Sequence, residues 1–192
     1  MGLCGQPLGP VTRTQFLGKV NPDRMAAHPI EQVLAALNSA GVRYLVVGGV
    51  AVVLHGHLRT TADLDLVVAL ADDNVRRAIP ALGLLGFRPR VPVPAEDFLD
   101  PEKRATWITE KGLTVFSLWS GQLPGIEVDL FVKEPFDFDQ AYARGIRVSL
   151  DSTTATVASL DDLIALKRAA GRPLDLADVE ALEAIAARGG RR

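Results

Sequence analysis

Cysteine is almost missing from this sequence: Cys4 stands alone among 192 residues and has no His or Cys nearby at a metal-binding spacing. A lone cysteine cannot form an internal disulfide, which excludes disulfide-stapled scaffolds and favours a reducing, cytoplasmic setting. No apolar run reaches the roughly eighteen residues that a membrane-spanning helix needs. Residues 1–24 also lack an apolar segment followed by small residues, so we expect no secretion signal.

Net charge is also low, since 21 Lys and Arg face 23 Asp and Glu. This balance lacks the basic excess of nucleic-acid-binding proteins and counts against a large RNA partner, without excluding a local basic patch. The residues available for such a patch are Arg76, Arg77, Arg88, Arg90, Lys103 and Arg104. The hydrophobic fraction of 48% and the charged fraction of 23% are typical of a globular protein with one substantial domain.

The most informative stretch is residues 43–70, RYLVVGGVAVVLHGHLRTTADLDLVVAL. An apolar, β-branched run at 44–47 ends at Gly48 and Gly49, which predicts a buried strand, a tight turn and then a short helix over 50–57. Free backbone N–H groups at such a junction can bind phosphate oxygens. The plainer alternative is that the two glycines only form the turn.

Two carboxylates, Asp63 and Asp65, begin the next predicted strand, in which alternate residues are Leu or Val. Because side chains alternate along a strand, both carboxylates face one way, with Cα atoms roughly 6.6–7 Å apart. They would repel each other unless a cation lies between them, and Mg²⁺ bound with nucleotide phosphates removes that repulsion. The alternative is that they are turn and cap residues.

A third carboxylate is predicted at Asp129. Residues 113–119 and 126–132 read as two strands around a turn, which predicts an antiparallel hairpin. Asp129 lies within the otherwise apolar second strand, where an ionised side chain is costly unless a cation or another partner holds it. Glu127, on the same face of the strand, is the alternative.

The Gly48-Gly49 turn, the R-x-T-x-D-x-D stretch at 59–65 and the later lone aspartate resemble the polymerase-β-type nucleotidyltransferase superfamily. More narrowly, residues 29–186 resemble small nucleotidyltransferases that include the AbiEii/MenT-type toxins of toxin–antitoxin systems and certain antibiotic nucleotidyltransferases. The resemblance implies Mg²⁺-dependent transfer of a nucleoside monophosphate from an NTP, such as ATP. It places Asp63 and Asp65 on the metal that bridges the triphosphate, and Asp129 with Asp65 on a second metal.

Arg59, Thr61 and Lys167 are further candidates for contact with the nucleotide. Arg59 either binds phosphates or the acceptor, or pairs with an aspartate of the metal site, and Thr61 is a turn former or a phosphate ligand. Lys167 continues the apolar stripe of a helix predicted over 159–170, so it either reaches out to water or points into a site. The resemblance favours contact between Lys167 and the nucleotide phosphates.

For the acceptor, resemblance to the toxins implies the 3′ end of tRNA, with a cognate antitoxin as a protein partner. The alternatives are an aminoglycoside or lincosamide hydroxyl, a partner protein that receives AMP, and a non-catalytic chain that only binds nucleotide or a partner. The presence of all three carboxylates argues against the last alternative.

The predicted fold is α/β, with a small mixed sheet and helices packed against it. We expect an extension over 1–28, a nucleotidyltransferase core over 29–150 and C-terminal helices over 151–188 that complete the nucleotide cleft. Met25 stands just before the first regular element, so the sequence leaves open which methionine starts the protein.

Several local expectations accompany this fold. Helices are predicted over 29–40 and 72–84, loop and a short helix over 95–111, and mainly helix beyond 135 apart from an extended piece near 146–150. Asp175 and Asp178 are expected to cap the last helix, with orientation of Lys167 as the alternative. Trp119 is expected in the core.

Overall fold

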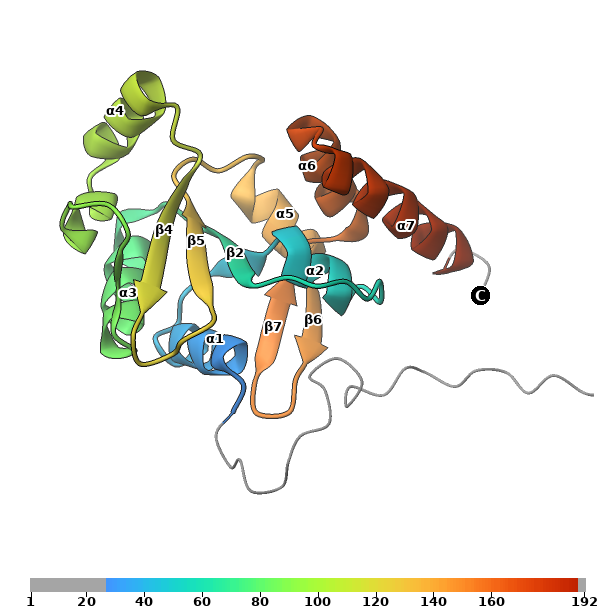
Figure 1. Ribbon diagram of the computed structural model, residues 1–192, viewed down its shortest axis with the longest axis horizontal. Helices are drawn as coiled ribbons and strands as arrows, with labels where there is room; N and C mark the ends of the chain where they lie inside the picture. The colour runs from blue at the N-terminus through green and yellow to red at the C-terminus, as the bar shows by residue number, and fades with distance from the viewer. Residues whose placement is uncertain (1–26, 190–192) are drawn as a thin grey trace, which may run out of the picture.

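The computed structural model describes residues 27–189, which form a mixed sheet of seven strands with helices on both faces (Figure 1). The strand order is β3-β4-β5-β2-β1-β7-β6. Two neighbouring pairs, β2 with β5 and β1 with β7, are parallel, and the other four are antiparallel. The strands are β1 Tyr44–Val46, β2 Asp63–Val68, β3 Phe87–Pro89, β4 Val115–Ser120, β5 Glu127–Phe131, β6 Ile146–Ser149 and β7 Thr154–Val157. The prediction of an α/β fold with a β4–β5 hairpin is confirmed.

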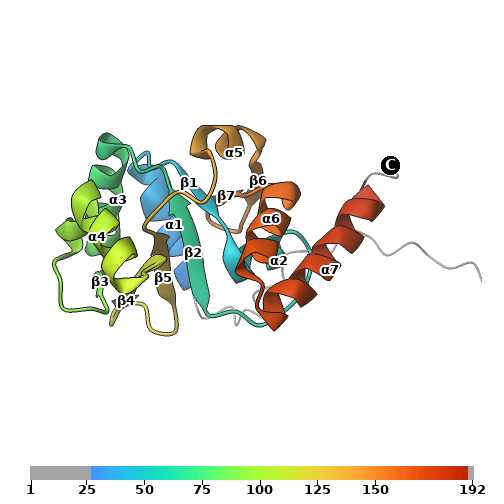
Figure 2. The ribbon, with the colours of Figure 1, turned by 90° about the horizontal axis from the view of Figure 1, so that it is seen from above.

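The helices lie in two groups (Figure 2), with α1 and α3 on one face of the sheet and α2, α6 and α7 on the other. Their bounds are α1 Pro29–Ser39, α2 Gly48–Leu54, α3 Asp72–Leu84, α4 Pro101–Lys111, α5 Phe138–Arg144, α6 Leu160–Ala170 and α7 Pro173–Gly189, with a 3-10 helix, η2, at Ala95–Leu99. The apolar stripe of α1 is buried against the sheet and α3, as its spacing predicts. The face that carries α6 and α7 is the one that holds the candidate site.

The helix α4 was not predicted at its full length. Asp100 caps it by accepting hydrogen bonds from two backbone N–H groups, Pro101 occupies its first turn, and Gly112 ends it with φ +62°. Of its eleven residues only Arg104 and Trp107 are buried, so no apolar stripe marks it in the sequence. The capping residues were the signal that could have identified this helix.

The expectation of mainly helical structure beyond residue 135 is wrong at β7. Residues 146–149 and 154–157 form a hairpin, and β7 then pairs in parallel with β1, with Val157 opposite Val46. A four-residue strand whose partner lies more than a hundred positions away carries little local signal. The pairing has a functional consequence, because the chain passes directly from β7 into α6 and so places α6 beside the turn that follows β1.

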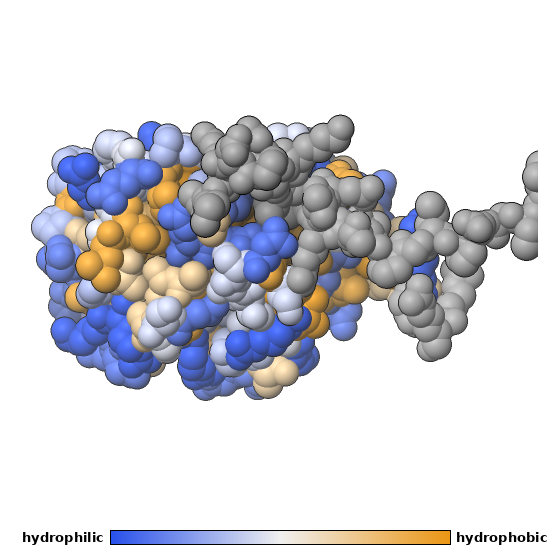
Figure 3. All heavy atoms as spheres, turned by 90° about the horizontal axis from the view of Figure 1, so that it is seen from below, coloured by the Kyte–Doolittle hydropathy of each residue, from blue (hydrophilic) through white to orange (hydrophobic). Residues whose placement is uncertain are grey.

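The six cations proposed for a basic patch do not form one. Four of them pair with carboxylates, in Arg76–Asp72, Arg77–Asp73, Arg90–Glu127 and Lys103–Asp97, while Arg104 is buried and donates to a backbone carbonyl and Arg88 lies over the Trp119 ring. Trp119 is 42% exposed, so its expected place in the core is wrong. Hydrophilic and apolar residues are interspersed on the face seen in Figure 3.

The expectations for Cys4, for Met25 as a start and for the extension up to residue 26 lie outside the described residues. Between residues 27 and 189, no helix has both the length and the apolar character required to cross a bilayer.

Candidate active site

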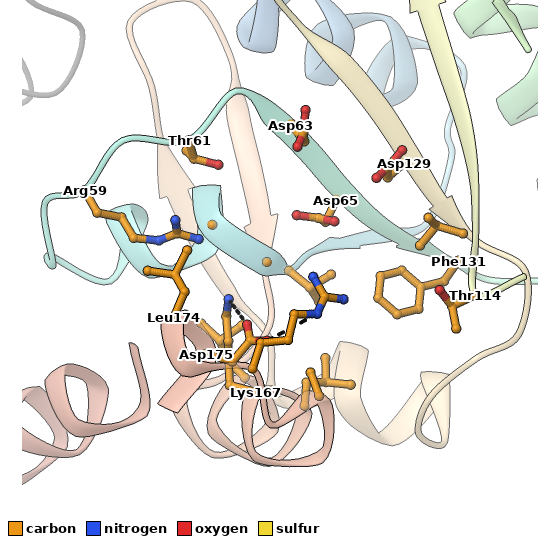
Figure 4. A pocket seen from close by; sticks show the side chains of 18 of the residues that line it. Arg59, Thr61, Asp63, Asp65, Thr114, Asp129, Phe131, Lys167, Leu174 and Asp175 are labelled. Carbon is orange, nitrogen blue, oxygen red and sulfur yellow. Dashed lines mark hydrogen bonds and ion pairs between the residues drawn. The ribbon is translucent and has the colours of Figure 1, made fainter. Parts of the chain in front are cut away.

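A cleft of about 930 Å³ lies between the sheet and the helices α6 and α7 (Figure 4). Its walls come from the β1–α2 turn, the segment before β2, the ends of β4 and β5, and the α6–α7 corner. The candidate metal and nucleotide ligands from the sequence line this one cleft, with the exception of Glu127: Gly48, Gly49, Arg59, Thr61, Asp63, Asp65, Asp129 and Lys167. The fold therefore brings together positions that are more than a hundred residues apart.

Three carboxylates project from neighbouring parallel strands on the cleft side of the sheet. In the register of β2 and β5, Asp65 lies opposite Asp129, and Asp63 lies opposite Glu127. Adjacent strands are roughly 4.8 Å apart, and residues two apart on a strand share a face, so all these side chains leave the same face. The strands were predicted from alternation, whereas their parallel pairing was not.

These carboxylates carry uncompensated negative charge. Burial and the nearby Asp129 raise the pKa of Asp65 to about 6, with Lys167 and the Gly49 N–H opposing the shift. Burial likewise raises the pKa of Asp129, although the Ser117 hydroxyl opposes it. Asp129 Oδ1 is buried and has no hydrogen-bond partner among the described residues. An unpaired buried carboxylate oxygen costs free energy unless a ligand compensates it.

The donor set suits a hard divalent cation, because such ions bind carboxylate oxygens and would relieve the repulsion that raises the Asp65 pKa. As the side chains stand in residues 27–189, no group of three or more Asp, Glu, His or Cys could hold one metal ion together. The Asp65 carboxylate accepts a hydrogen bond from the Gly49 N–H. Glu127 is paired with Arg90, which lowers its pKa and makes it a poorer alternative to Asp129.

Gly48 and Gly49 allow the β1–α2 turn to approach the carboxylates closely. Gly48 has φ +62°, and a Cβ added there would overlap the Asp65 carboxylate. A Cβ on Gly49 would overlap Thr61 Oγ1 and would lie 2.5 Å from Arg59 Nη2. Asp65 therefore favours glycine at position 48, and the segment that carries Arg59 and Thr61 favours glycine at position 49. The helix α2 begins at Gly48 itself, two residues earlier than expected.

Lys167 reaches the cleft from the buried face of α6, and only 7% of it is exposed. Ser159 caps this helix through the Asp162 N–H, as predicted, and Gly171 ends it. The ammonium Nζ lies 2.9 Å from Asp175 Oδ1 and 2.8 Å from Asp178 Oδ2.

The expectation that Asp175 and Asp178 cap the last helix is wrong. The helix α7 begins at Pro173, and both aspartates are buried in its first turns, where they face α6. The alternative, that they orient Lys167, matches the contacts. Arg59 joins the same group, since its Nε lies 3.2 Å from Asp178 Oδ1 and it therefore pairs with α7 rather than with a metal-site aspartate.

The cleft also contains residues that sequence reasoning missed or left open. Phe131 lies two residues after Asp129 on the same strand face and lines the cleft beside Thr114. Leu166 and Leu174 line the opposite wall, from α6 and α7. His55, at the end of α2, has its Nε2 2.8 Å from the Ala158 carbonyl oxygen, and burial lowers its pKa.

Solved structures with a similar fold include the lincosamide antibiotic adenylyltransferase LnuA with lincomycin bound, at 14% identity and a TM-score of 0.56, covering 82% of this chain and 96% of that chain. Another is ANT(2″)-Ia in complex with adenylyl-2″-tobramycin, at 14% identity and a TM-score of 0.51, covering 80% and 84%. A nucleotidyltransferase-like antigenic protein from Paracoccidioides brasiliensis has 17% identity and a TM-score of 0.51, covering 80% and 73%. At these identities the likeness shows the fold alone.

Among curated proteins, none matches the chain. A family model does match it, over residues 28–187, and that family is described as "Nucleotidyltransferase of unknown function (DUF6036)". The match spans most of the chain, including the Gly48-Gly49 turn, all three sheet carboxylates and Lys167. The chain therefore belongs to this nucleotidyltransferase family.

Proposed function

We propose that this protein transfers a nucleoside monophosphate from an NTP to an acceptor hydroxyl in the cytoplasm, with Mg²⁺ as the metal. The observation that carries the proposal is the placement of Asp63, Asp65 and Asp129 on one face of two parallel strands, across a single cleft from Lys167. Uncompensated carboxylates on one wall and a cation on the other match the two needs of the reaction, which are metal binding and phosphate binding.

Each wall has a separate task in this reaction. Asp63, Asp65 and Asp129 would hold divalent cations. Such cations would neutralise charge on the triphosphate and lower the pKa of the acceptor hydroxyl. Lys167 and Arg59 face the phosphates from the other side, where their charge favours departure of pyrophosphate when the acceptor oxygen forms its bond to the α-phosphorus. The Gly48-Gly49 turn lines the cleft beside Asp65, which brings its backbone next to the expected position of the phosphates.

The acceptor best supported by the geometry is a small hydroxylated molecule of the aminoglycoside or lincosamide kind. Within residues 27–189, the cations weighed for a basic patch are paired, buried or stacked on an aromatic ring, so they offer no tract for RNA phosphates. The cleft volume of about 930 Å³ suits small ligands. The similar folds of LnuA with lincomycin and ANT(2″)-Ia with an adenylylated tobramycin agree with this choice.

The second candidate acceptor is the 3′ end of tRNA, as in an AbiEii/MenT-type toxin with a cognate antitoxin. It rests on the resemblance of residues 29–186 to the AbiEii/MenT-type toxins. A tRNA end is narrow enough to enter the cleft, but the six cations weighed for a basic patch are paired, buried or stacked and so are poorly placed to hold the body of the tRNA.

The test supplies four α-labelled NTPs in turn, with Mg²⁺, to three acceptors: an aminoglycoside and lincosamide panel, total tRNA, and the protein itself. Asp65→Ala serves as the blank. Label on a drug would identify a small hydroxylated molecule as the acceptor. Label on tRNA would instead identify the tRNA 3′ end as the acceptor, as in the toxins. If the native protein neither transfers label to any acceptor nor binds any NTP, the proposed function is wrong.

A further inference from the structure

Asp178 contacts two cations of the cleft without lining the cleft itself. Its Oδ2 lies 2.8 Å from Lys167 Nζ, and its Oδ1 lies 3.2 Å from Arg59 Nε. The residue is only 1% exposed. Both cations line the cleft, whereas Asp178 does not, so its contact with a bound nucleotide would be indirect, through these two partners.

The two partners come from different parts of the chain. Lys167 belongs to α6, while Arg59 belongs to the segment between α2 and β2. The Arg59 guanidinium is confined on its other side as well, because it lies over Gly49 in the space that a Cβ would occupy. Asp178 therefore joins α7 to α6 and to the segment between α2 and β2.

Asp175 provides a natural comparison within the same helix. It also contacts Lys167, at 2.9 Å, and it lies 3.7 Å from the exposed Arg172, but the structure shows no ion pair between it and Arg59. Asp175 lines the cleft, whereas Asp178 does not. Both aspartates thus contact Lys167, but Asp178 also pairs with Arg59, whereas Asp175 pairs with Arg172.

We infer that Asp178 is a positioning residue, which holds the Lys167 ammonium and the Arg59 guanidinium in place for the phosphates of the NTP. The inference rests on the proposed function, since it assumes that these cations meet phosphates. Two flexible cationic side chains lose conformational entropy when they bind a ligand, and a buried carboxylate that fixes both in advance lowers that cost. Asp178 thereby contributes to nucleotide affinity without contacting nucleotide.

The test measures the Kd of a non-hydrolysable NTP with Mg²⁺ by calorimetry, together with thermal unfolding of each variant. Asp178→Asn should weaken binding about tenfold in a chain that still folds. In a double-mutant cycle, Asp178→Asn and Arg59→Gln should be coupled by about fivefold, because both act through one contact. The matched cycle of Asp175→Asn with Arg59→Gln should show additive effects.

The inference is overturned if Asp178→Asn binds the NTP as tightly as the native protein does, or if the two cycles show equal coupling. Either result leaves the proposed function intact as long as the native protein binds NTP. If the native protein binds no NTP, the proposed function itself fails, which is a separate result. Should Asp178→Asn not fold, Asp178→Glu keeps the buried charge balanced and displaces the carboxylate by one methylene. Weaker NTP binding by that folded variant supports the inference, and unchanged binding contradicts it.

Discussion

The aspartates on the sheet and the aspartates on α7 have opposite surroundings. On the sheet, Asp65 and Asp129 have raised pKa values, and within the described residues neither has a Lys or Arg at ion-pair distance. On α7, Asp175 and Asp178 both lie within 3 Å of Lys167. One group leaves negative charge open to a ligand, and the other neutralises its charge inside the protein.

A ligand can contribute most free energy at the aspartates on the sheet. Buried carboxylates without cations destabilise the fold, and a divalent ion is the partner that would reverse the effect. Buried carboxylates already paired with cations gain little from a further ligand, and their role is to hold those cations in place. The sheet group is thus suited to chemistry and the α7 group to positioning.

Asp65→Asn removes one charge from the sheet group. We expect transfer to fall about a thousandfold, because a bound metal contributes several kcal/mol to the transition state and each 1.4 kcal/mol is about tenfold. The free energy of unfolding without metal should hold or rise, because the lost charge was repelled by Asp129. Label transfer and chemical denaturation in EDTA measure the two effects. A variant with native transfer would contradict the assignment of Asp65.

Lys167→Met tests the other group. The substitution keeps the side-chain length but leaves Asp175 and Asp178 without their shared cation. Removing one partner of a buried ion pair costs about 3–5 kcal/mol, so the free energy of unfolding should fall by that order. Denaturation curves give the value, and Lys167→Met combined with Asp175→Asn should recover part of the loss. Unchanged stability would show that the α7 charges are not held by Lys167.

A smaller effect should appear in the pH dependence of stability without metal. The native pKa of Asp65 is about 6, against an ordinary value of 3.8. Between these values the native state binds a proton that the unfolded state does not, so the free energy of unfolding should fall as pH rises from about 4 to 6, by at most about 3 kcal/mol. Because Asp65 and Asp129 interact, the transition belongs to the pair. Denaturation at several pH values checks it, and Asp65→Asn should flatten the dependence.

Local patterns in the sequence predicted the elements that carry the sheet carboxylates. Alternation in 64–70 and 126–132, together with the glycines at 48 and 49, was sufficient to place Asp65, Asp129 and the turn on their elements. The parallel register that sets Asp65 opposite Asp129 could not be predicted in this way, because it depends on strands more than sixty residues apart. The short strand β7 was missed for the same reason.

The α7 aspartates show a different limit of prediction. Near the start of a helix, a D-x-x-D spacing is typical of capping residues, and nothing local separates a cap from an ion-pair partner. Only the packing of α7 against α6 brings Asp175 and Asp178 to Lys167. The distinction between the two groups of carboxylates is therefore a property of the tertiary structure.

The smallest effect is expected at Glu127, which shares the sheet face of Asp129 but resembles the α7 group in its pairing. Arg90 holds this carboxylate at the rim and lowers its pKa, and the pair is largely open to solvent. Because exposed ion pairs contribute little, Glu127→Gln should leave thermal unfolding unchanged and alter transfer by no more than about threefold. Asp129→Asn is the matched variant and should lose most transfer, because its carboxylate has no such partner. If both variants lost transfer equally, Glu127 would also bind metal. Pairing with a cation would then not distinguish carboxylates that position cations from those that bind metal.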